Sequence, residues 1–304
     1  MIVGCDFSST PTTRKPVVLA FGAFAGAAKN SRTQSSQRHA EIAEELNGNP
    51  ALSANPPRPL RSDVLVLQGL ERCPSLAAFG EWLNQEGDWI GGFDFPFGLP
   101  RELVEHLRWP LTWRECIAHY SSLTRADIRK TFAAFCDARP VGGKFAHRAF
   151  DKRAGSSPSM KWVNPPVAYM LHAALPLLLE AGVHMPGLHE GDKRRVALEA
   201  YPGLLARELV ARRSYKSDEK SKHTPERLIA RKDIVTRLEH GETRLGLRLK
   251  LTHAQRDTLV GDASGDSLDA ALCMLQAAWA AREGPPNYGL PDELDPLEGW
   301  IVSC

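Results

Sequence analysis

The stretch IVGCDFSS, residues 2–9, opens the chain with a short apolar run that ends at Phe7 and contains one acidic residue, Asp6. A second apolar run, Val17 to Ala25, follows after a turn-rich segment, Ser8 to Pro16. Two such runs on either side of a turn rich in Ser, Thr and Pro predict an antiparallel hairpin. A charged carboxylate in an apolar strand is costly unless it meets a cation or hydrogen-bond donors. Asp6 is therefore the first candidate functional residue.

Outward from this hairpin, the apolar pattern predicts a mixed α/β fold. Further strands are predicted at residues 64–70, 89–95 and 195–201, and helices at 75–85, 124–133, 167–180, 202–213, 225–238 and 268–282. Strands that alternate with helices in the second half imply parallel strands joined by helical crossovers. We expect a single domain over residues 1–304, with a mixed five-stranded sheet and helices on both of its faces. A polar insertion at 29–62 and a helical insertion at about 101–190, between strands four and five, complete the expected domain.

The C-terminal part carries two further signals. Leu268, Leu272, Leu275 and Trp279 have spacings of four, three and four residues, which predict one buried helix face. The tail after Arg282 contains acidic residues but no Lys or Arg, and we expect it to wrap the surface.

The overall composition is that of a soluble globular protein. Hydrophobic residues make up 43% of the 304 residues and charged residues 24%. The formal net charge of +2 excludes a globally basic nucleic-acid-binding surface but permits local basic patches. No apolar stretch approaches the roughly 18 residues of a membrane helix, and the first residues do not resemble a signal peptide. The six cysteines form no C-x-x-C pair, so we expect no structural zinc. We expect a cytoplasmic location.

Acidic residues recur at positions where a sheet would expose them along one edge. Asp94 ends the fourth predicted strand, and Asp266 and Asp269 open the last predicted helix with the i, i+3 spacing that places them on one side. Converging carboxylates repel one another unless a cation neutralises them, and oxygen-only ligation favours Mg²⁺ or Mn²⁺. Each residue also has a structural explanation: Asp266 as an N-cap, Asp269 interacting with the helix dipole, and Asp94 organising a turn.

Several motifs together resemble a known family. They are GCDFS (residues 4–8), GFDFP (92–96), EAYP (199–202), Lys216-Ser217 with Arg231 downstream, and DSLDA (266–270). With these motifs the chain resembles the family called domain of unknown function 429, a set of predicted ribonuclease H-like nucleases. The final motif is also similar to that of the Holliday-junction resolvase RuvC, whose last helix presents two Asp residues three apart.

This resemblance implies a ribonuclease H-like fold and a metal-dependent nuclease activity. In such folds the first strand, the fourth strand and the last helix supply the metal carboxylates, which implies Asp6, Asp94, Asp266 and Asp269 as catalytic metal ligands here. The RuvC-like pattern usually has Glu at the second position, where this chain has the shorter Asp94. Two ions held by these residues would hydrolyse a phosphodiester without a dedicated Ser, Cys or His nucleophile.

Two segments have the basic excess that a phosphate backbone requires. Residues 193–237 contain 13 Lys and Arg against 6 Asp and Glu, and residues 125–161 contain 9 against 3. We therefore expect nucleic acid, DNA or RNA, as the partner. The residues expected to contact substrate are Lys216, Arg231, Arg148 and Glu199. For Glu199 a salt bridge to an arginine is the alternative, and for the basic residues a solvated helix face.

Two other classes of function stay open. An actin-like or sugar-kinase-like phosphotransferase also begins with a strand that ends in Asp, but it needs two copies of the core, and no internal repeat is visible. A non-catalytic module that binds nucleic acid or a protein is the second alternative. Motifs of dinucleotide enzymes, P-loop NTPases, zincins and α/β-hydrolases are missing. We expect no membrane partner, and a homodimer is left open.

Overall fold

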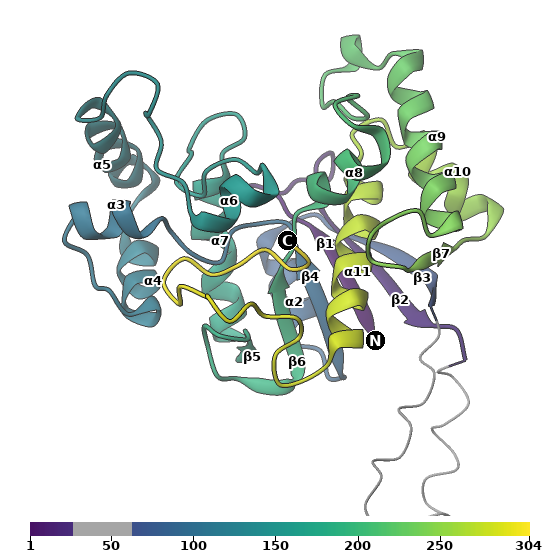
Figure 1. Ribbon diagram of the computed structural model, residues 1–304, viewed down its shortest axis with the longest axis horizontal. Helices are drawn as coiled ribbons and strands as arrows, with labels where there is room; N and C mark the ends of the chain where they lie inside the picture. Colours follow the sequence, from purple (N-terminus) through teal and green to yellow (C-terminus); the bar gives the residue numbers. More distant parts are fainter. Residues whose placement is uncertain (27–62) are drawn as a thin grey trace, which may run out of the picture.

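A seven-stranded mixed sheet lies at the centre of the protein (Figure 1). The computed structural model describes residues 1–26 and 63–304, so the polar insertion expected at 29–62 lies outside the described residues. The strand order is β5-β6-β4-β1-β2-β3-β7, and β2 alone runs antiparallel to its neighbours. The strands are β1 (Ile2–Asp6), β2 (Val17–Phe24), β3 (Val64–Cys73), β4 (Trp89–Phe93), β5 (Val183–His184), β6 (Asp192–Glu199) and β7 (Arg248–Lys250).

The prediction of a mixed α/β fold is confirmed, but the predicted count of five strands is wrong. The five expected strands correspond to β1, β2, β3, β4 and β6. The two further strands, β5 and β7, contain two and three residues and lie at the two edges of the sheet. Strands this short cannot show the alternation of apolar and polar residues from which a strand is recognised.

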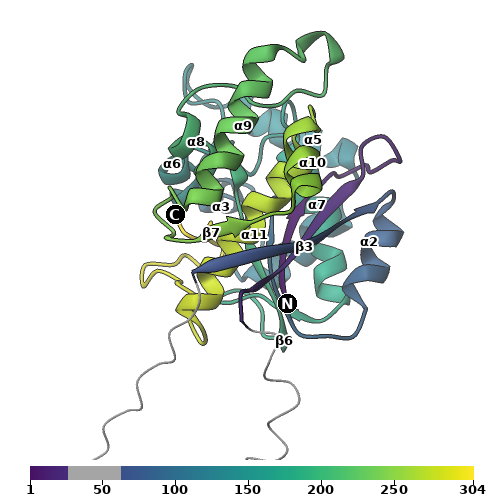
Figure 2. The same ribbon diagram turned by 90° about the vertical axis from the view of Figure 1, so that its right-hand side faces the viewer.

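Helices cover both faces of the sheet (Figure 2). One layer contains α8 to α11, whose apolar side chains pack on β1, β2 and β3. The other face is covered by α2 and by helices of the insertion between β4 and β6. The helices are α2 (Leu76–Leu83), α3 (Arg101–His106), α4 (Trp113–Ser122), α5 (Arg125–Asp137), α6 (Ala149–Ala154), α7 (Val167–Glu180), α8 (Pro202–Val210), α9 (Pro225–His240), α10 (His253–Gly261) and α11 (Asp266–Glu283), with a short 3₁₀ helix at Lys220–Lys222.

Glycines let α11 approach the centre of the sheet closely. Gly4 of β1 and Gly92 of β4 are paired across the two parallel strands. A Cβ atom on Gly4 would lie 2.0 Å from the carbonyl oxygen of Ala270, and one on Gly92 would lie 2.5 Å from that of Cys273. Because side chains alternate between the faces of a strand, Asp6 points to the same side as Gly4, toward α11.

Burial of α11 is more extensive than the predicted single apolar face. Ala270, Ala271, Ala277 and Ala278 are fully buried on its other sides, whereas Trp279 of the predicted stripe is only partly buried. The small alanine side chains allow the sheet, neighbouring helices and the C-terminal tail to contact the helix from several directions. No helix of the described residues combines the length and the apolar character needed to cross a bilayer.

The C-terminal tail enters the fold rather than only wrapping it. Ile301 and Val302 are buried, and the N–H of Val302 donates to the carbonyl oxygen of Glu199 at 2.8 Å. The Glu298 carboxylate accepts from the backbone N–H groups of Arg101 and Ala149, the first residues of α3 and α6. One of the acidic residues of the tail, Glu298, therefore caps two helices of the insertion, a role that the composition of the tail does not reveal.

Candidate metal centre

Three carboxylates from distant parts of the chain meet where β1 and β4 end. Asp6 is the last residue of β1, Asp94 follows β4, and Asp269 lies in the first turn of α11. One oxygen of each lies within 4.8 Å of the others. The N–H of Asp94 donates to the carbonyl oxygen of Cys5 at 2.9 Å, which continues the pairing of the two strands and brings Asp94 beside Asp6. The structure thus brings together three of the four acidic residues that the sequence singled out.

Burial and mutual repulsion disfavour the ionised forms of Asp6 and Asp94 in the absence of a cation. Burial raises the pKa of Asp6 well above its ordinary value, and the charges of Asp269, Asp266 and Asp94 raise it further, while Lys216 opposes them. The pKa of Asp94 rises to about 7, chiefly through burial and to a lesser extent through Asp269. A divalent cation would reverse both effects because it favours the ionised carboxylates.

Lys216 and Tyr215 give Asp269 its hydrogen-bond partners. The ammonium of Lys216 forms an ion pair with one carboxylate oxygen of Asp269, and the hydroxyl of Tyr215 donates to the other at 2.6 Å. Burial alone would lower the pKa of Lys216, but the surrounding anions, Asp269 first, outweigh it and raise that pKa. Lys216 is therefore a charged group at the acidic cluster, where the sequence predicted a phosphate contact.

Asp266 lies beside the three-carboxylate group rather than in it. It is the first residue of α11, and the N-cap is Gly265, whose φ of +83° is in the left-handed region that glycine tolerates. The backbone N–H of Ser267 is capped by the Asp262 carboxylate at 2.9 Å. The explanation of Asp266 as an N-cap is therefore wrong, while its charge is close enough to contribute to the raised pKa of Asp6.

Glu199 and Arg148 pair with each other. The guanidinium of Arg148 donates to both carboxylate oxygens of Glu199, at 2.7 and 2.5 Å, and also to Asp151 at 2.8 Å. The exposed fractions of the three residues are 1% for Arg148, 4% for Glu199 and 0% for Asp151. The salt-bridge alternative for Glu199 is confirmed. Because the N–H donors of Arg148 are taken by Glu199 and Asp151, the geometry does not support Arg148 as a phosphate contact.

Arg231 also has a structural role. Its guanidinium donates to the carbonyl oxygens of Val260 and Tyr215, both at 2.7 Å, and the residue is only 4% exposed. Arg231 therefore does not face the site as predicted, but fixes the backbone at Tyr215 and so orients the segment that carries Lys216. Tyr215 itself was missed, because its place next to Lys216 was the only signal and a tyrosine has no metal-binding pattern.

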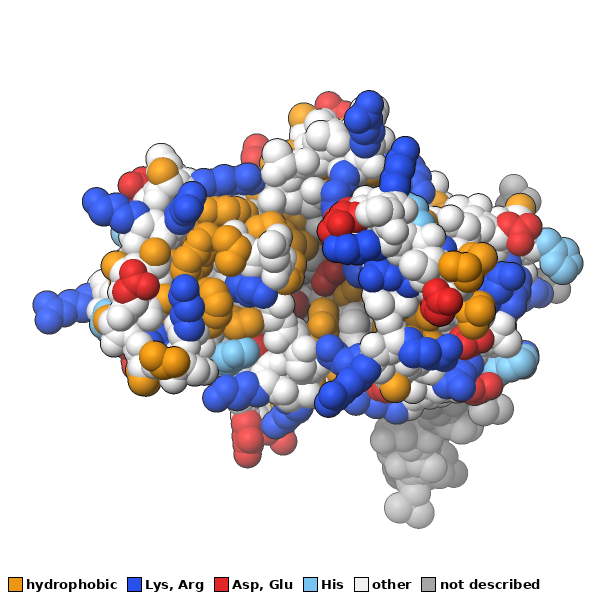
Figure 3. Space-filling model, turned by 90° about the horizontal axis from the view of Figure 1, so that it is seen from above, with side chains coloured by type: hydrophobic (Ala, Val, Ile, Leu, Met, Phe, Trp, Pro, Cys, Tyr) orange, Lys and Arg blue, Asp and Glu red, His pale blue; other side chains and the backbone are white. Residues whose placement is uncertain are grey.

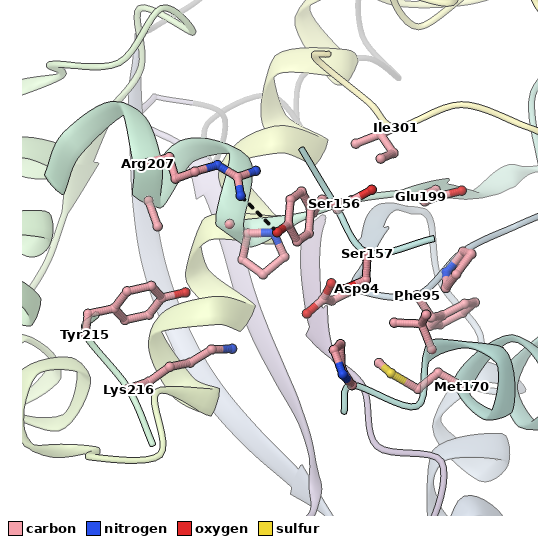
Figure 4. A pocket seen from close by; sticks show the side chains of 18 of the residues that line it. Asp94, Phe95, Ser156, Ser157, Met170, Glu199, Arg207, Tyr215, Lys216 and Ile301 are labelled. Atoms are coloured by element: carbon pink, nitrogen blue, oxygen red, sulfur yellow. Dashed lines mark hydrogen bonds between the residues drawn. The ribbon is translucent and has the colours of Figure 1, made fainter. Parts of the chain in front are cut away.

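A cavity of about 620 Å³ opens beside the acidic cluster. Seen from above, the molecule is hollowed between the insertion and the layer of α8 to α10, and acidic side chains are visible at the bottom (Figure 3). Asp94 and Lys216 both line the cavity. Figure 4 shows Lys216 extending from one wall toward the side on which Asp94 lies.

The donor set fits a hard divalent cation. The clustered residues Asp6, Asp94 and Asp269 supply only carboxylate oxygens, which suit Mg²⁺ or Mn²⁺ better than zinc. Comparison of the chain with protein-family models, with curated proteins and with solved structures finds no match.

Proposed function

We propose that the protein is a metal-dependent nuclease with a ribonuclease H-like fold, which hydrolyses phosphodiester bonds of nucleic acid. The observation that carries the proposal is the convergence of Asp6, Asp94 and Asp269, with oxygens within 4.8 Å, next to Lys216 at the wall of a cavity. Three separate structural roles do not explain this convergence, because the cluster contains more negative charge than Lys216 can neutralise.

The arrangement of the sheet supports the fold that the motif resemblance implies. Strands β3, β2, β1, β4 and β6 lie side by side in that order, and only β2 is antiparallel. The carboxylates come from the first strand, the fourth strand and the last helix, as that resemblance requires. The described residues contain this sheet once, whereas an actin-like or sugar-kinase-like phosphotransferase needs two copies of the core.

Asp6, Asp94 and Asp269 would hold the cation, with Asp266 close by. When bound, such an ion would activate a water molecule and stabilise the leaving oxygen of a phosphodiester. Lys216 supplies a positive charge for the phosphate, and Tyr215 holds the carboxylate of Asp269 in position through its hydroxyl. The paired Arg148 and Glu199 support the backbone after β4, because Glu199 accepts from the N–H of Phe97 at 2.8 Å.

The test combines metal binding with cleavage. Mn²⁺ at 100 times its dissociation constant should stabilise the folded protein by about 2.7 kcal/mol. Asp6→Asn should abolish both this stabilisation and Mn²⁺-dependent cleavage of nucleic acid, because the neutral amide removes one ligand charge without changing size. Asp257→Asn, on the exposed side of α10, is the matched control and should retain both.

Retained cleavage in Asp6→Asn would refute the catalytic role of this cluster. A Mn²⁺ shift that is equal in the wild type and in Asp6→Asn would place the ion elsewhere. A metal shift lost in Asp6→Asn with no cleavage of DNA, RNA, hybrid or junction substrates would instead favour a module that binds nucleic acid without turnover.

A further inference from the structure

The cavity beside the acidic cluster has two chemically different walls. One wall comes from the insertion, where the exposed Pro165 and the half-buried Val167 and Met170 of the first turn of α7 line the cavity. Figure 4 shows Met170 on the same side as Phe95, which follows Asp94 on the floor. These side chains offer an apolar surface directly beside a carboxylate cluster.

The opposite wall carries positive charge. It is formed by α8 and the segment that follows, from which Arg207, Arg212, Arg213 and Lys216 line the cavity. The guanidinium carbon of Arg207 lies over the ring of Tyr201, 5.2 Å from the ring centroid. Arg212 is exposed and has no ion-pair partner among the described residues.

Size and charge together restrict the ligand. A cavity of about 620 Å³ is in the range of sites for small molecules, roughly 300 to 1,000 Å³. Apart from Arg148 and Glu199, which pair with each other, its lining includes three arginines and one lysine against the single carboxylate of Asp94. A ligand with a flat apolar part and a phosphate close to it matches both walls.

We propose that this cavity binds one unpaired nucleotide of the substrate, with its base against the Val167 and Met170 wall and its phosphate toward Lys216. This inference rests on the proposed nuclease function and adds the substrate class: single-stranded nucleic acid. In a duplex the bases are stacked inside, so a base reaches such a cavity only from a single strand or after flipping out.

A polar group in the cavity suits the edge of a base. The hydroxyl of Ser157 lines the cavity and has no hydrogen-bond partner among the residues that the structure describes. Ser157 and Asp94 are both among the lining residues drawn in Figure 4. Its neighbour Ser156 donates instead to Asp151 at 3.1 Å, so Ser157 is the one of the two serines whose hydroxyl is free for a ligand.

The test is binding of short labelled single strands, DNA and RNA, and of the corresponding duplexes to the full chain in EDTA at equal salt. We expect at least one kind of single strand to bind about tenfold more tightly than its duplex. Val167→Glu places a carboxylate on the apolar wall, where it removes the apolar contact with the base and repels the phosphate, and should weaken single-strand binding about tenfold, the loss of roughly one base contact. Val141→Glu, at a fully exposed residue outside the cavity lining, is the matched control.

Equal or tighter binding of the duplexes by the wild type would overturn the proposal without any variant. Unchanged single-strand binding in a folded Val167→Glu would overturn it as well, and Met170→Ala replaces that variant if it does not fold. Because these measurements are made in EDTA, they are separate from the Mn²⁺ tests. If the Mn²⁺ tests failed, the preference for single strands could still be observed. If the protein preferred duplexes, the Mn²⁺ tests could still succeed.

Discussion

The molecule contains two clusters of buried charge that solve the same electrostatic problem differently. In the Arg148 cluster, one guanidinium pairs with Glu199 and Asp151 and every charged group has a hydrogen-bond partner. In the acidic cluster, Lys216 forms an ion pair with Asp269, and neither Asp6 nor Asp94 has an ion-pair partner among the described residues. In the Arg148 cluster, which we call the closed cluster, the charges compensate one another and stabilise the fold. The second has negative charge left over and borders a cavity, which is the condition for binding a cation.

Removing the cation of the closed cluster should have the largest effect on stability. Arg148→Met leaves Glu199 and Asp151 buried without their partner, and we expect a loss of about 3–5 kcal/mol in the free energy of unfolding. Urea denaturation in EDTA measures it. Arg213→Met is the matched control, because Arg213 forms an exposed pair with Asp233 and its loss should cost about 1 kcal/mol or less. A similar small loss for both variants would contradict the structural role of Arg148.

The acidic cluster depends on the close approach of α11, and Gly4→Ala should break it. The added Cβ would lie 2.0 Å from the carbonyl oxygen of Ala270, so α11 must move and carry Asp269 away from Asp6. We expect about 1–3 kcal/mol of destabilisation, as for other overpacked cores, and loss of the Mn²⁺-induced shift. Gly69→Ala, in β3 with open space around it, should change neither. An unchanged Mn²⁺ shift in Gly4→Ala would show that α11 does not set the metal geometry.

The uncompensated charge of the acidic cluster predicts that stability depends on pH through Asp94. The pKa of Asp94 is about 7 in the folded protein against an ordinary 3.8, so the metal-free fold binds this proton more tightly than the unfolded chain does. Stability from this group is therefore present at low pH and is lost as the pH rises through about 7. Asp94→Asn should be more stable than the wild type by about 1–2 kcal/mol at alkaline pH, since a group facing a cavity is partly screened, and about equal to it near pH 4.

Urea denaturation in EDTA across this pH range tests the Asp94 prediction. Asp257→Asn serves again as the control and should show no such trend, because Asp257 is exposed on α10. If the difference in free energy of unfolding between Asp94→Asn and the wild type does not grow with pH, the idea of uncompensated charge is contradicted.

The smallest expected effect comes from Tyr215→Phe. This change removes the hydroxyl that donates to Asp269 and should cost about 0.5–1.5 kcal/mol of stability. Tyr120→Phe is matched to it, since Tyr120 is buried and donates to the carbonyl oxygen of Ala168 at 2.9 Å. Both variants should lose similar stability in thermal unfolding, but only Tyr215→Phe should weaken Mn²⁺ binding. Equal Mn²⁺ affinities would remove Tyr215 from the site.

The sequence predicted the acidic cluster better than the closed one, for a physical reason. Asp6 and Asp94 follow apolar strands, and Asp269 lies in an apolar helix, so each is conspicuous in its own segment. Arg148 and Glu199 are 51 residues apart, and nothing local distinguishes a buried arginine from a phosphate-binding one. Their pairing depends on how the insertion docks, which periodicity does not encode.

The same limit applies to the fold. Five strands were predicted because each has several apolar residues in succession, whereas β5 and β7 exist only through their pairing with β6 and β3. Asp266 was expected to bind the metal with Asp269 because i, i+3 spacing places two residues on one side of a helix and because the motif resemblance implies both as ligands. Both residues lie in the first turn of α11, as predicted. The position of this turn relative to β1 and β4 brings only Asp269 into the three-carboxylate group.

The carboxylate of Glu298 has a consequence for the order in which the chain folds. It caps α3 and α6 across sequence separations of 197 and 149 residues, so neither helix has this cap until the tail docks. Contacts over such distances form slowly because a long loop must close first. The insertion and the tail should therefore become ordered together. A protease that cuts between Gly284 and Leu297 would loosen two helices far from the cut as well as the tail itself.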